Sequence, residues 1–222
     1  MVVPTQRTNP PMNLEKACAA VFEYEASDLF PRGSAAWTVV LAAIKAGTLH
    51  VDLSSHGRPL LHCAAYSCSA TVVKRLLEMG ASPSLMDMHG SCAMHMAVLG
   101  GHDVAAKCAM LPPGDLACQS KLFGTPLHAC AMKLKMWATP PPRLVNGAFG
   151  KYMEALRWML QQPGCPVHVA DSHCRSPMDI LNESELCGEA CEMLAAELAR
   201  RARWTALRAA WIGVVVAEKA SW

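Results

Sequence analysis

The sequence predicts an all-α fold, a solenoid of about five helix-turn-helix units with short hairpin loops and degenerate caps at both ends. Two observations predict it. First, His62, His95 and His128 follow one another at intervals of 33 residues, each within a variant of the same short phrase. Second, paired apolar residues and a glycine recur at the same interval after the phrase. A fixed period shared by several residue types indicates one supersecondary unit stacked on copies of itself.

The repeated phrase resembles the Thr-Pro-Leu-His signature of the ankyrin repeat, whose period is also about 33 residues. Residues 125–128 have this sequence, and residues 176–179 (Ser-Pro-Met-Asp) are similar to it in the fifth unit. Residues 72–81 resemble the family's second helix and its Gly-Ala ending, and Gly101-His102 occupies the link between the two helices. The resemblance implies an ankyrin-repeat domain over residues 13–210.

The chemistry of the phrase explains why its residues recur. Threonine can cap the helix, proline suits the first helical turn, and histidine can reach back from the third position. Pro59 replaces the threonine in the second unit, and Cys92, in the third, lacks a strong capping side chain. We therefore expect the third unit to be the most weakly capped.

The pattern weakens at both ends and is interrupted once. Residues 1–12 are expected to form a mobile N-terminal tail, and the first helix is predicted from Asn13 to about Ala26. In the fourth unit the second helix arrives 17 residues late, which predicts a loop insert at about residues 134–150. Its run Pro140–Arg143 favours polyproline II, which SH3- or WW-type domains can bind, or else forms a solvated spacer.

The C-terminal segment has no helix-breaking Gly-Ala pair, so its helix should run on, with residues 211–222 as a C-terminal tail. Alanines recur on one face, and bulky residues form a second stripe with arginines between the two. The bulky stripe consists of Trp204, Leu207, Trp211 and Val214. One interpretation is a capping helix whose tryptophans fold back over the last unit. The alternative is an amphipathic surface that binds a partner helix or an anionic membrane, although the scattered arginines argue against membrane contact.

Composition limits the function classes. Charged residues are 17% of the 222 residues, apolar residues are 52%, and the formal net charge of +2 does not predict nucleic-acid binding. The 11 cysteines are odd in number and scattered through helical positions, and no hydrophobic leader follows Met1. We therefore expect reduced thiols and a cytoplasmic location, with the nucleus as the alternative.

No catalytic or cofactor motif is evident, so the chain is expected to have no enzymatic activity and no cofactor. The best metal-ligand constellation has the residue types that zinc prefers, namely Cys165, His168, Asp171, His173 and Cys174. Each of these residues also has a place in the repeat pattern. Metal binding therefore remains a remote alternative.

The family resemblance implies a non-catalytic protein–protein interaction module, an adaptor or scaffold that binds another protein on its concave face. That face is formed by hairpin tips and first helices. Carried over by position, the partner-binding residues would be Arg58, Tyr66, Met86, Met88, His89, Ser91, Lys121, Leu122, Met132, Lys133, His173 and Arg175. Exposed Met and Leu flanked by basic residues form an adaptable interface. Alternatively, hairpin residues vary freely because they carry no function.

Overall fold

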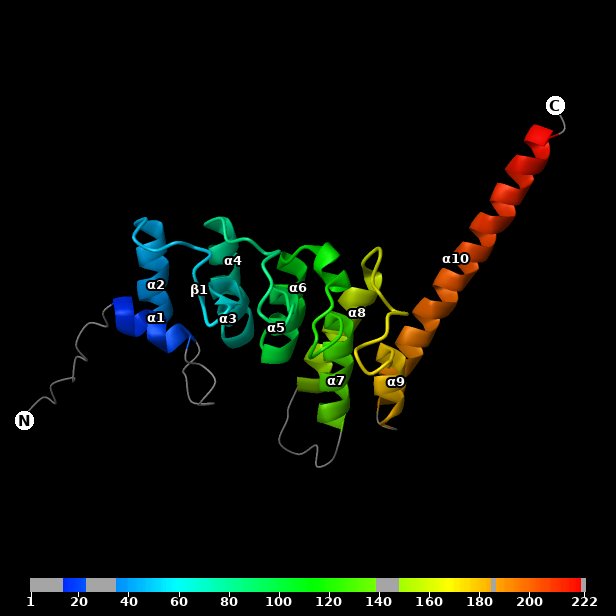
Figure 1. Cartoon of the computed structure of the whole chain (residues 1–222). Coiled ribbons are helices and arrows are strands. Elements are labelled where there is room, and N and C mark those ends of the chain that lie inside the picture. Colours follow the sequence, from blue (N-terminus) through cyan, green and yellow to red (C-terminus); the bar gives the residue numbers. More distant parts are fainter. Residues whose placement is uncertain (1–13, 23–34, 139–147, 185–186, 221–222) are drawn as a thin grey trace, which may run out of the picture.

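The computed structural model describes residues 14–22, 35–138, 148–184 and 187–220, with side chains described as far as Leu207. Within these ranges the helices follow one another in pairs (Figure 1). The pairs are α1 (Leu14–Phe22) with α2 (Ala35–Lys45), α3 (Leu60–Ser67) with α4 (Ala70–Glu78), α5 (Ala93–Gly100) with α6 (Val104–Met110), α7 (Pro126–Ala138) with α8 (Ala148–Gln161), and α9 (Pro177–Asn182) with α10 (Gly188–Ala220).

The pairs stack side by side and form two layers of helices. In one layer α3 packs on α5, α5 on α7, and α7 on α9. In the other layer α2 packs on α4, α4 on α6, α6 on α8, and α8 on α10. Each pair therefore contacts mainly its neighbours, as expected for a repeated unit that cannot bury its apolar face alone.

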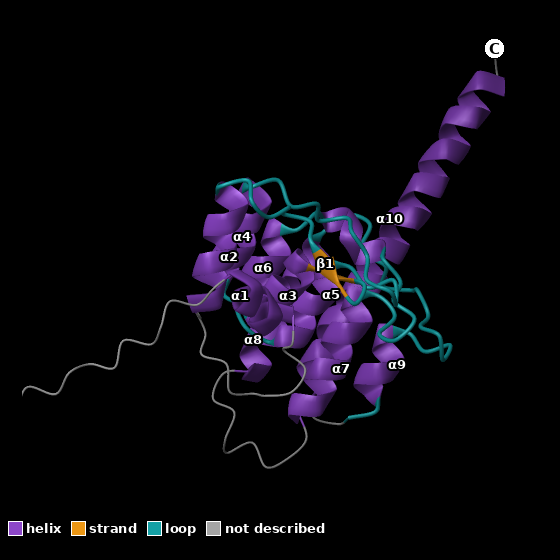
Figure 2. Cartoon of the chain, turned by 60° about the vertical axis from the view of Figure 1, so that its left-hand side comes forward, coloured by secondary structure: helices purple, strands orange, loops and turns teal. Residues whose placement is uncertain are grey.

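The connections between pairs are hairpin loops that gather on one side of the stack (Figure 2). The first contains the antiparallel strands β1 (Ser54–Ser55) and β2 (Arg58–Pro59). Between them His56 and Gly57 both have positive φ, 51° and 71°, as a two-residue hairpin turn requires. Single bridges, Met86 with Cys92 and Ser120 with Gly124, close the next two hairpins. The 3₁₀ helix η2 (Pro113–Ala117) precedes the last of these.

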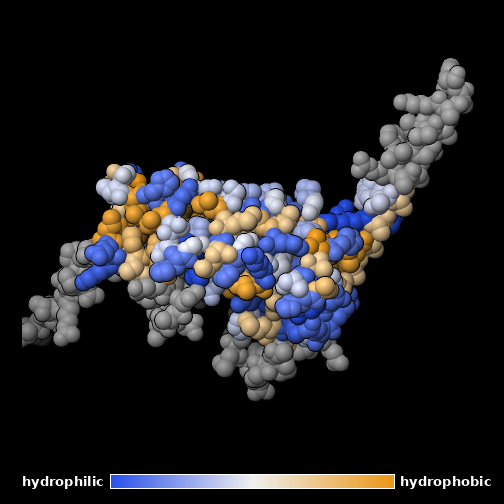
Figure 3. Space-filling model, viewed as in Figure 1, coloured by the Kyte–Doolittle hydropathy of each residue, from blue (hydrophilic) through white to orange (hydrophobic). Residues whose placement is uncertain are grey.

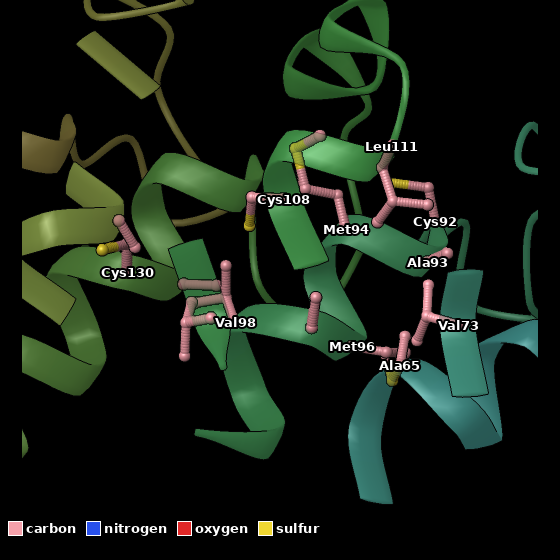
Figure 4. Close-up of a cluster of buried hydrophobic side chains, with 14 of the residues drawn as sticks. Ala65, Val73, Cys92, Ala93, Met94, Met96, Val98, Cys108, Leu111 and Cys130 are labelled. Atoms are coloured by element: carbon pink, nitrogen blue, oxygen red, sulfur yellow. The ribbon is translucent and has the colours of Figure 1, made fainter. Parts of the chain in front are cut away.

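The core lies between the layers and is built largely from small and sulfur-containing side chains. Val73, Met94, Cys108 and Cys130 come from four different helices, and each is fully buried. Figure 4 shows side chains of these helices entering one buried layer. Helix α5 is buried from Ala93 through Val98 because neighbouring pairs cover it on both sides. This accounts for the near absence of polar residues from that helix.

Two close contacts hold the third pair against the second. Gly100 lies so near α3 that a Cβ at this position would be 1.9 Å from the backbone oxygen of Tyr66. Lys107 is fully buried in α6, and its Nζ donates a 2.7 Å hydrogen bond to the carbonyl of Ala65 near the end of α3. A cation at the C-terminal end of a helix is electrostatically favourable. Burial lowers the pKa of Lys107 to about 8.

The structure corrects the predicted insert in the fourth unit. Residues 134–138 are helical and belong to α7, and α8 begins at Ala148, so the loop is shorter than residues 134–150. The physical reason is that Leu134, fully buried, and Trp137, partly buried, continue the apolar face of α7. The run Pro140–Arg143 lies outside the described residues, so its polyproline conformation stays a prediction.

The two ends are described only in part. Helix α1 spans Leu14–Phe22, while residues 1–13 and 23–34 lie outside the described part of the chain, so the predicted start at Asn13, the predicted end near Ala26 and the mobile tail stay predictions. Ala17 and Val21 are buried on one face of α1, as predicted. At the other end, α10 continues to Ala220, so no helix end coincides with the predicted domain boundary at residue 210.

Substitution of Gly100 by alanine should destabilise the stack by about 2 kcal/mol, because the new methyl group would collide with the Tyr66 carbonyl. The clash should outweigh the gain of about 1 kcal/mol that alanine brings to a helix. Urea unfolding monitored by circular dichroism measures the difference. Gly114→Ala is the matched control, since a Cβ there meets nothing within 4 Å. Equal stability of the two variants would contradict the close approach.

Candidate functional site

The three periodic histidines connect each helix pair to the hairpin of the next. The Nε2 atom of His62 lies 2.8 Å from the Ser91 carbonyl oxygen, and that of His95 lies 2.8 Å from the Gly124 carbonyl oxygen. The Nε2 atom of His128 lies 3.0 Å from the Arg175 carbonyl oxygen. Because a carbonyl oxygen can only accept, each Nε2 carries the proton and donates it. Each acceptor residue directly precedes the residue that caps the first helix of the next pair.

The other ring nitrogen stabilises the start of the histidine's own helix. Nδ1 of His95 accepts from the Cys92 backbone N–H at 3.2 Å, and Nδ1 of His128 accepts from the Thr125 N–H at 3.2 Å. The Thr125 hydroxyl also lies 2.8 Å from the His128 Nδ1. This arrangement confirms that these histidines act in hydrogen bonding at the helix start.

In the second unit this contact is missing. Nδ1 of His62 is buried and has no hydrogen-bond partner among the residues that the structure describes, because Pro59 stands three residues earlier and proline has no backbone N–H. Cys92, by contrast, does approach His95, with Sγ 3.2 Å from Nδ1. The expectation that the third unit is the most weakly capped was therefore wrong: among the units that begin with this histidine, the second is.

Aspartates fix the shape of two hairpins. Oδ1 of Asp87 accepts from the backbone N–H groups of His89 and Ser91, at 2.9 and 2.8 Å. Oδ1 of Asp171 accepts from those of His173 and Arg175, at 2.8 and 3.0 Å. The sequence alone did not assign this function to either aspartate. Both aspartates stand at the same sequence distance before the start of the next helix, and this shared spacing was the signal that could have identified their function.

Neighbouring hairpins are also connected to each other. The Lys121 N–H donates to the His89 carbonyl at 2.9 Å, and the Gln119 side chain donates to the Ala170 carbonyl at 3.1 Å. The hydroxyls of Ser91 and Ser120 are buried and lie 2.9 Å apart. The hairpins therefore form one continuous, hydrogen-bonded edge on the stack (Figure 2).

This edge presents apolar side chains to solvent. Met86 is 55% exposed, Met88 66% and Leu122 55%, and the three lie on two adjacent hairpins. The predicted residues His89, Lys121 and His173 are also exposed. These six residues are called the hairpin surface below.

The remaining predicted residues are less accessible. Five of them are half-buried, namely Arg58, Tyr66, Met132, Lys133 and Arg175. Arg175 forms ion pairs with Asp171 at 2.9 Å and Glu183 at 3.7 Å, and burial lowers the pKa of Lys133. Ser91 is fully buried and cannot contact a partner, which corrects its assignment as a binding residue. Its hydroxyl is directed at Ser120, because the hairpin packs against the next one.

The zinc alternative finds no support in the described ranges, where no three His, Cys, Asp or Glu side chains are placed to hold a metal ion. Cys165 is buried, and burial raises the pKa of its thiol to about 11. Asp171 already binds two backbone N–H groups and the Arg175 guanidinium. By contrast, His168, His173 and Cys174 are exposed.

The C-terminal helix covers the last pair with only part of its length. Ala190 and Leu194 of α10 are fully buried, whereas Trp204 is 64% and Leu207 59% exposed. The interpretation that Trp204 folds back over the last unit was therefore wrong. Trp211 lies outside the residues with described side chains. None of the described helices is both long enough and apolar enough to cross a bilayer.

Replacing Pro59 by threonine should raise the free energy of unfolding by about 1 kcal/mol, because it supplies His62 Nδ1 with a backbone N–H and a hydroxyl. Cys92→Thr should raise it less, since Cys92 already provides the N–H contact to His95. Chemical unfolding of both variants measures the two effects. A larger gain for Cys92→Thr would contradict the assignment of the second unit as the weaker.

Stability should decrease as the pH falls from about 6.5 towards 4. Burial lowers the pKa of His62, His95 and His128, that of His95 to about 4, so the unfolded chain binds protons in this window that the folded chain does not. His95 then contributes a slope of up to about 1.4 kcal/mol per pH unit, and His62 and His128 change the stability in the same direction, with full stability above the window.

Urea unfolding between about pH 7 and pH 5 measures this slope. His95→Gln should lower stability at neutral pH and reduce the slope by about one proton. His89→Gln controls for the loss of an exposed imidazole. A slope unchanged by His95→Gln would contradict the coupling between this histidine and folding.

Comparison with known proteins is consistent with this geometry. The ankyrin repeat family matches residues 56–85, which contain the β1–β2 turn, α3 and α4. The human protein "SH3 and multiple ankyrin repeat domains protein 2" is 31% identical over 94 residues. That match covers 41% of this chain and 5% of the human protein, so the chain corresponds to a small part of that relative. The matched segment shows an ankyrin repeat at residues 56–85, and the 33-residue period and the histidine contacts of the neighbouring units are consistent with it.

Proposed function

We propose that the chain is a non-catalytic ankyrin stack of five units, an adaptor or scaffold that binds a partner protein on its hairpin surface. Ankyrin repeats generally mediate protein–protein interaction. The observation that supports this surface is the exposure of Met86, Met88 and Leu122 on two adjacent, hydrogen-bonded hairpins. Large apolar side chains that a folded chain leaves in water are candidates for an interface.

The chemistry of the surface favours binding. Methionine is flexible and polarizable, so Met86 and Met88 can adapt to the shape of a partner. Lys121, on the hairpin that carries Leu122, adds a positive charge at the border. The backbone beneath is fixed by Asp87 and by the inter-hairpin hydrogen bonds, so a partner would order few backbone residues on binding.

Several observations support a function without catalysis. The recurring histidines use their ring nitrogens within the stack, which leaves His95 and His128 without a free nitrogen to act as a base. Burial raises the pKa of the buried thiols, that of Cys63 and Cys108 to about 12, and a protonated thiol is a poor nucleophile. The cysteines of the described residues are free, which supports a reducing compartment, the cytoplasm or the nucleus.

The double substitution Met88→Glu with Leu122→Glu should weaken partner binding at least about tenfold, because two carboxylates would be desolvated in an apolar contact. Affinity capture from a native lysate, quantified by mass spectrometry, measures the loss. Thr71→Glu with Gln161→Glu is the matched control, since it adds the same charge at exposed positions of α4 and α8. Partners retained by both double variants would exclude the hairpin surface as the binding site.

A further inference from the structure

The outer part of α10 has no neighbour within the described residues. The helix is anchored by Ala190 and Leu194, and its last contact with the stack is made by Arg201, whose guanidinium donates to the Cys165 carbonyl. From Ala202 through Leu207 every side chain is exposed. The backbone continues as helix to Ala220, away from the stack (Figure 1). A single helix without tertiary contacts is marginally stable in water, so this segment would gain from a partner.

A hollow of about 360 Å³ lies along this part of the helix. It is lined by Ala196, Ala199, Arg200, Arg203, Trp204 and Leu207. These positions follow the three- and four-residue spacing of a single helix face over three turns. Alanine at one end allows close approach, and Trp204 and Leu207 at the other offer apolar area to a bound side chain.

The border of this face is basic. Glu197 already binds both Arg200 and Arg201, with Arg200 Nη2 and Arg201 Nε each 2.6 Å from Glu197 Oε1. Arg203 has no ion-pair partner among the residues that the structure describes. Between Glu197 and Glu218 the sequence contains no acidic residue. Hydrophilic and hydrophobic residues lie side by side where α10 leaves the stack (Figure 3).

We propose that this face of α10 binds an acidic amphipathic helix from a partner protein. An apolar side chain of that helix enters the hollow beside Trp204 and Leu207, and a carboxylate at its border pairs with Arg203. A helix fits better than an extended segment, because α10 offers no unpaired backbone groups along its length for strand pairing. A second copy of this chain fits less well, because its own Arg200 and Arg203 would meet the same arginines across the contact.

The test uses the whole chain as bait for a display library of helical 20-residue peptides with randomised surface positions. Peptides that bind the natural chain are selected first, and peptides that also bind the Trp204→Ala variant are then removed. The selected peptides should combine an apolar stripe with flanking Asp or Glu. Trp204→Ala should weaken the best peptide by about 30-fold or more, as expected for a tryptophan at the centre of an interface. Thr71→Glu with Gln161→Glu is the control on other helices and should not change the affinity.

A charge exchange tests the assignment of Arg203. Arg203→Glu should weaken the acidic peptide by about fivefold or more, and a peptide with Lys in place of its acidic residues should regain binding to this variant. Selection of peptides without an acidic bias would overturn the proposal. Binding of anionic vesicles to the natural chain but not to Trp204→Ala would also overturn it, because that result would assign the face to a membrane. Dimerisation in solution that Leu207→Glu abolishes would overturn it as well, because that result would assign the face to a second copy of the chain. The hairpin variants test a different surface, so the two proposals fail separately.

Discussion

The hydrogen bond from a histidine Nε2 to a backbone carbonyl of the following unit is the interaction on which the rest of the structure depends. His62, His95 and His128 make it with Ser91, Gly124 and Arg175. Each acceptor lies directly before a helix cap, so the imidazoles of His95 and His128 fix both the start of their own helix and the position of the next hairpin, whereas His62 fixes only the next hairpin. A side chain with a donor on one edge and an acceptor on the other is required, which explains the recurrence of neutral histidine.

This interaction also governs what the surface can present. Because an imidazole holds the end of each of the three hairpins before α5, α7 and α9, and Asp87 or Asp171 also holds two of them, the tips of these hairpins are free to vary without loss of the fold. Met86, Met88 and Leu122 occupy such tips or their flanks. The separation of supporting and displayed residues within one short loop is the means by which stacked units acquire different binding specificities.

The period predicted the helix pairs, because a 33-residue interval shared by histidine, glycine and apolar pairs has no other simple structural cause. It also placed the hairpins, and six of the predicted surface residues are exposed there. The predictions that were wrong depended on side-chain packing, about which the period gives no information. Residues 134–138 are helical because Leu134 and Trp137 find apolar neighbours. Ser91 is buried because the next hairpin supplies Ser120.

The errors at the second unit and at α10 have a common origin. Pro59 and Cys92 differ as helix caps because only Cys92 can donate a backbone N–H to the histidine of its helix. The capping preference of the side chain does not decide the difference. Whether Trp204 folds back depends on the direction in which α10 leaves α9, which the sequence does not specify. Spacing indicates which residues share a face, but only the packed structure shows what that face contacts.

The missing partner of His62 Nδ1 has a consequence for how the molecule comes apart. Stacked units lose their order one at a time, and separation begins at the joint with the least favourable coupling. Within the described residues, Nδ1 of His62 in the second unit is buried without a partner, and this unit packs directly against the pair α1–α2. The joint between these first two units would therefore open while the later units stay closed. A protease acting on the opened segment would leave a shortened but folded remnant that still carries the hairpins of Met88 and Leu122.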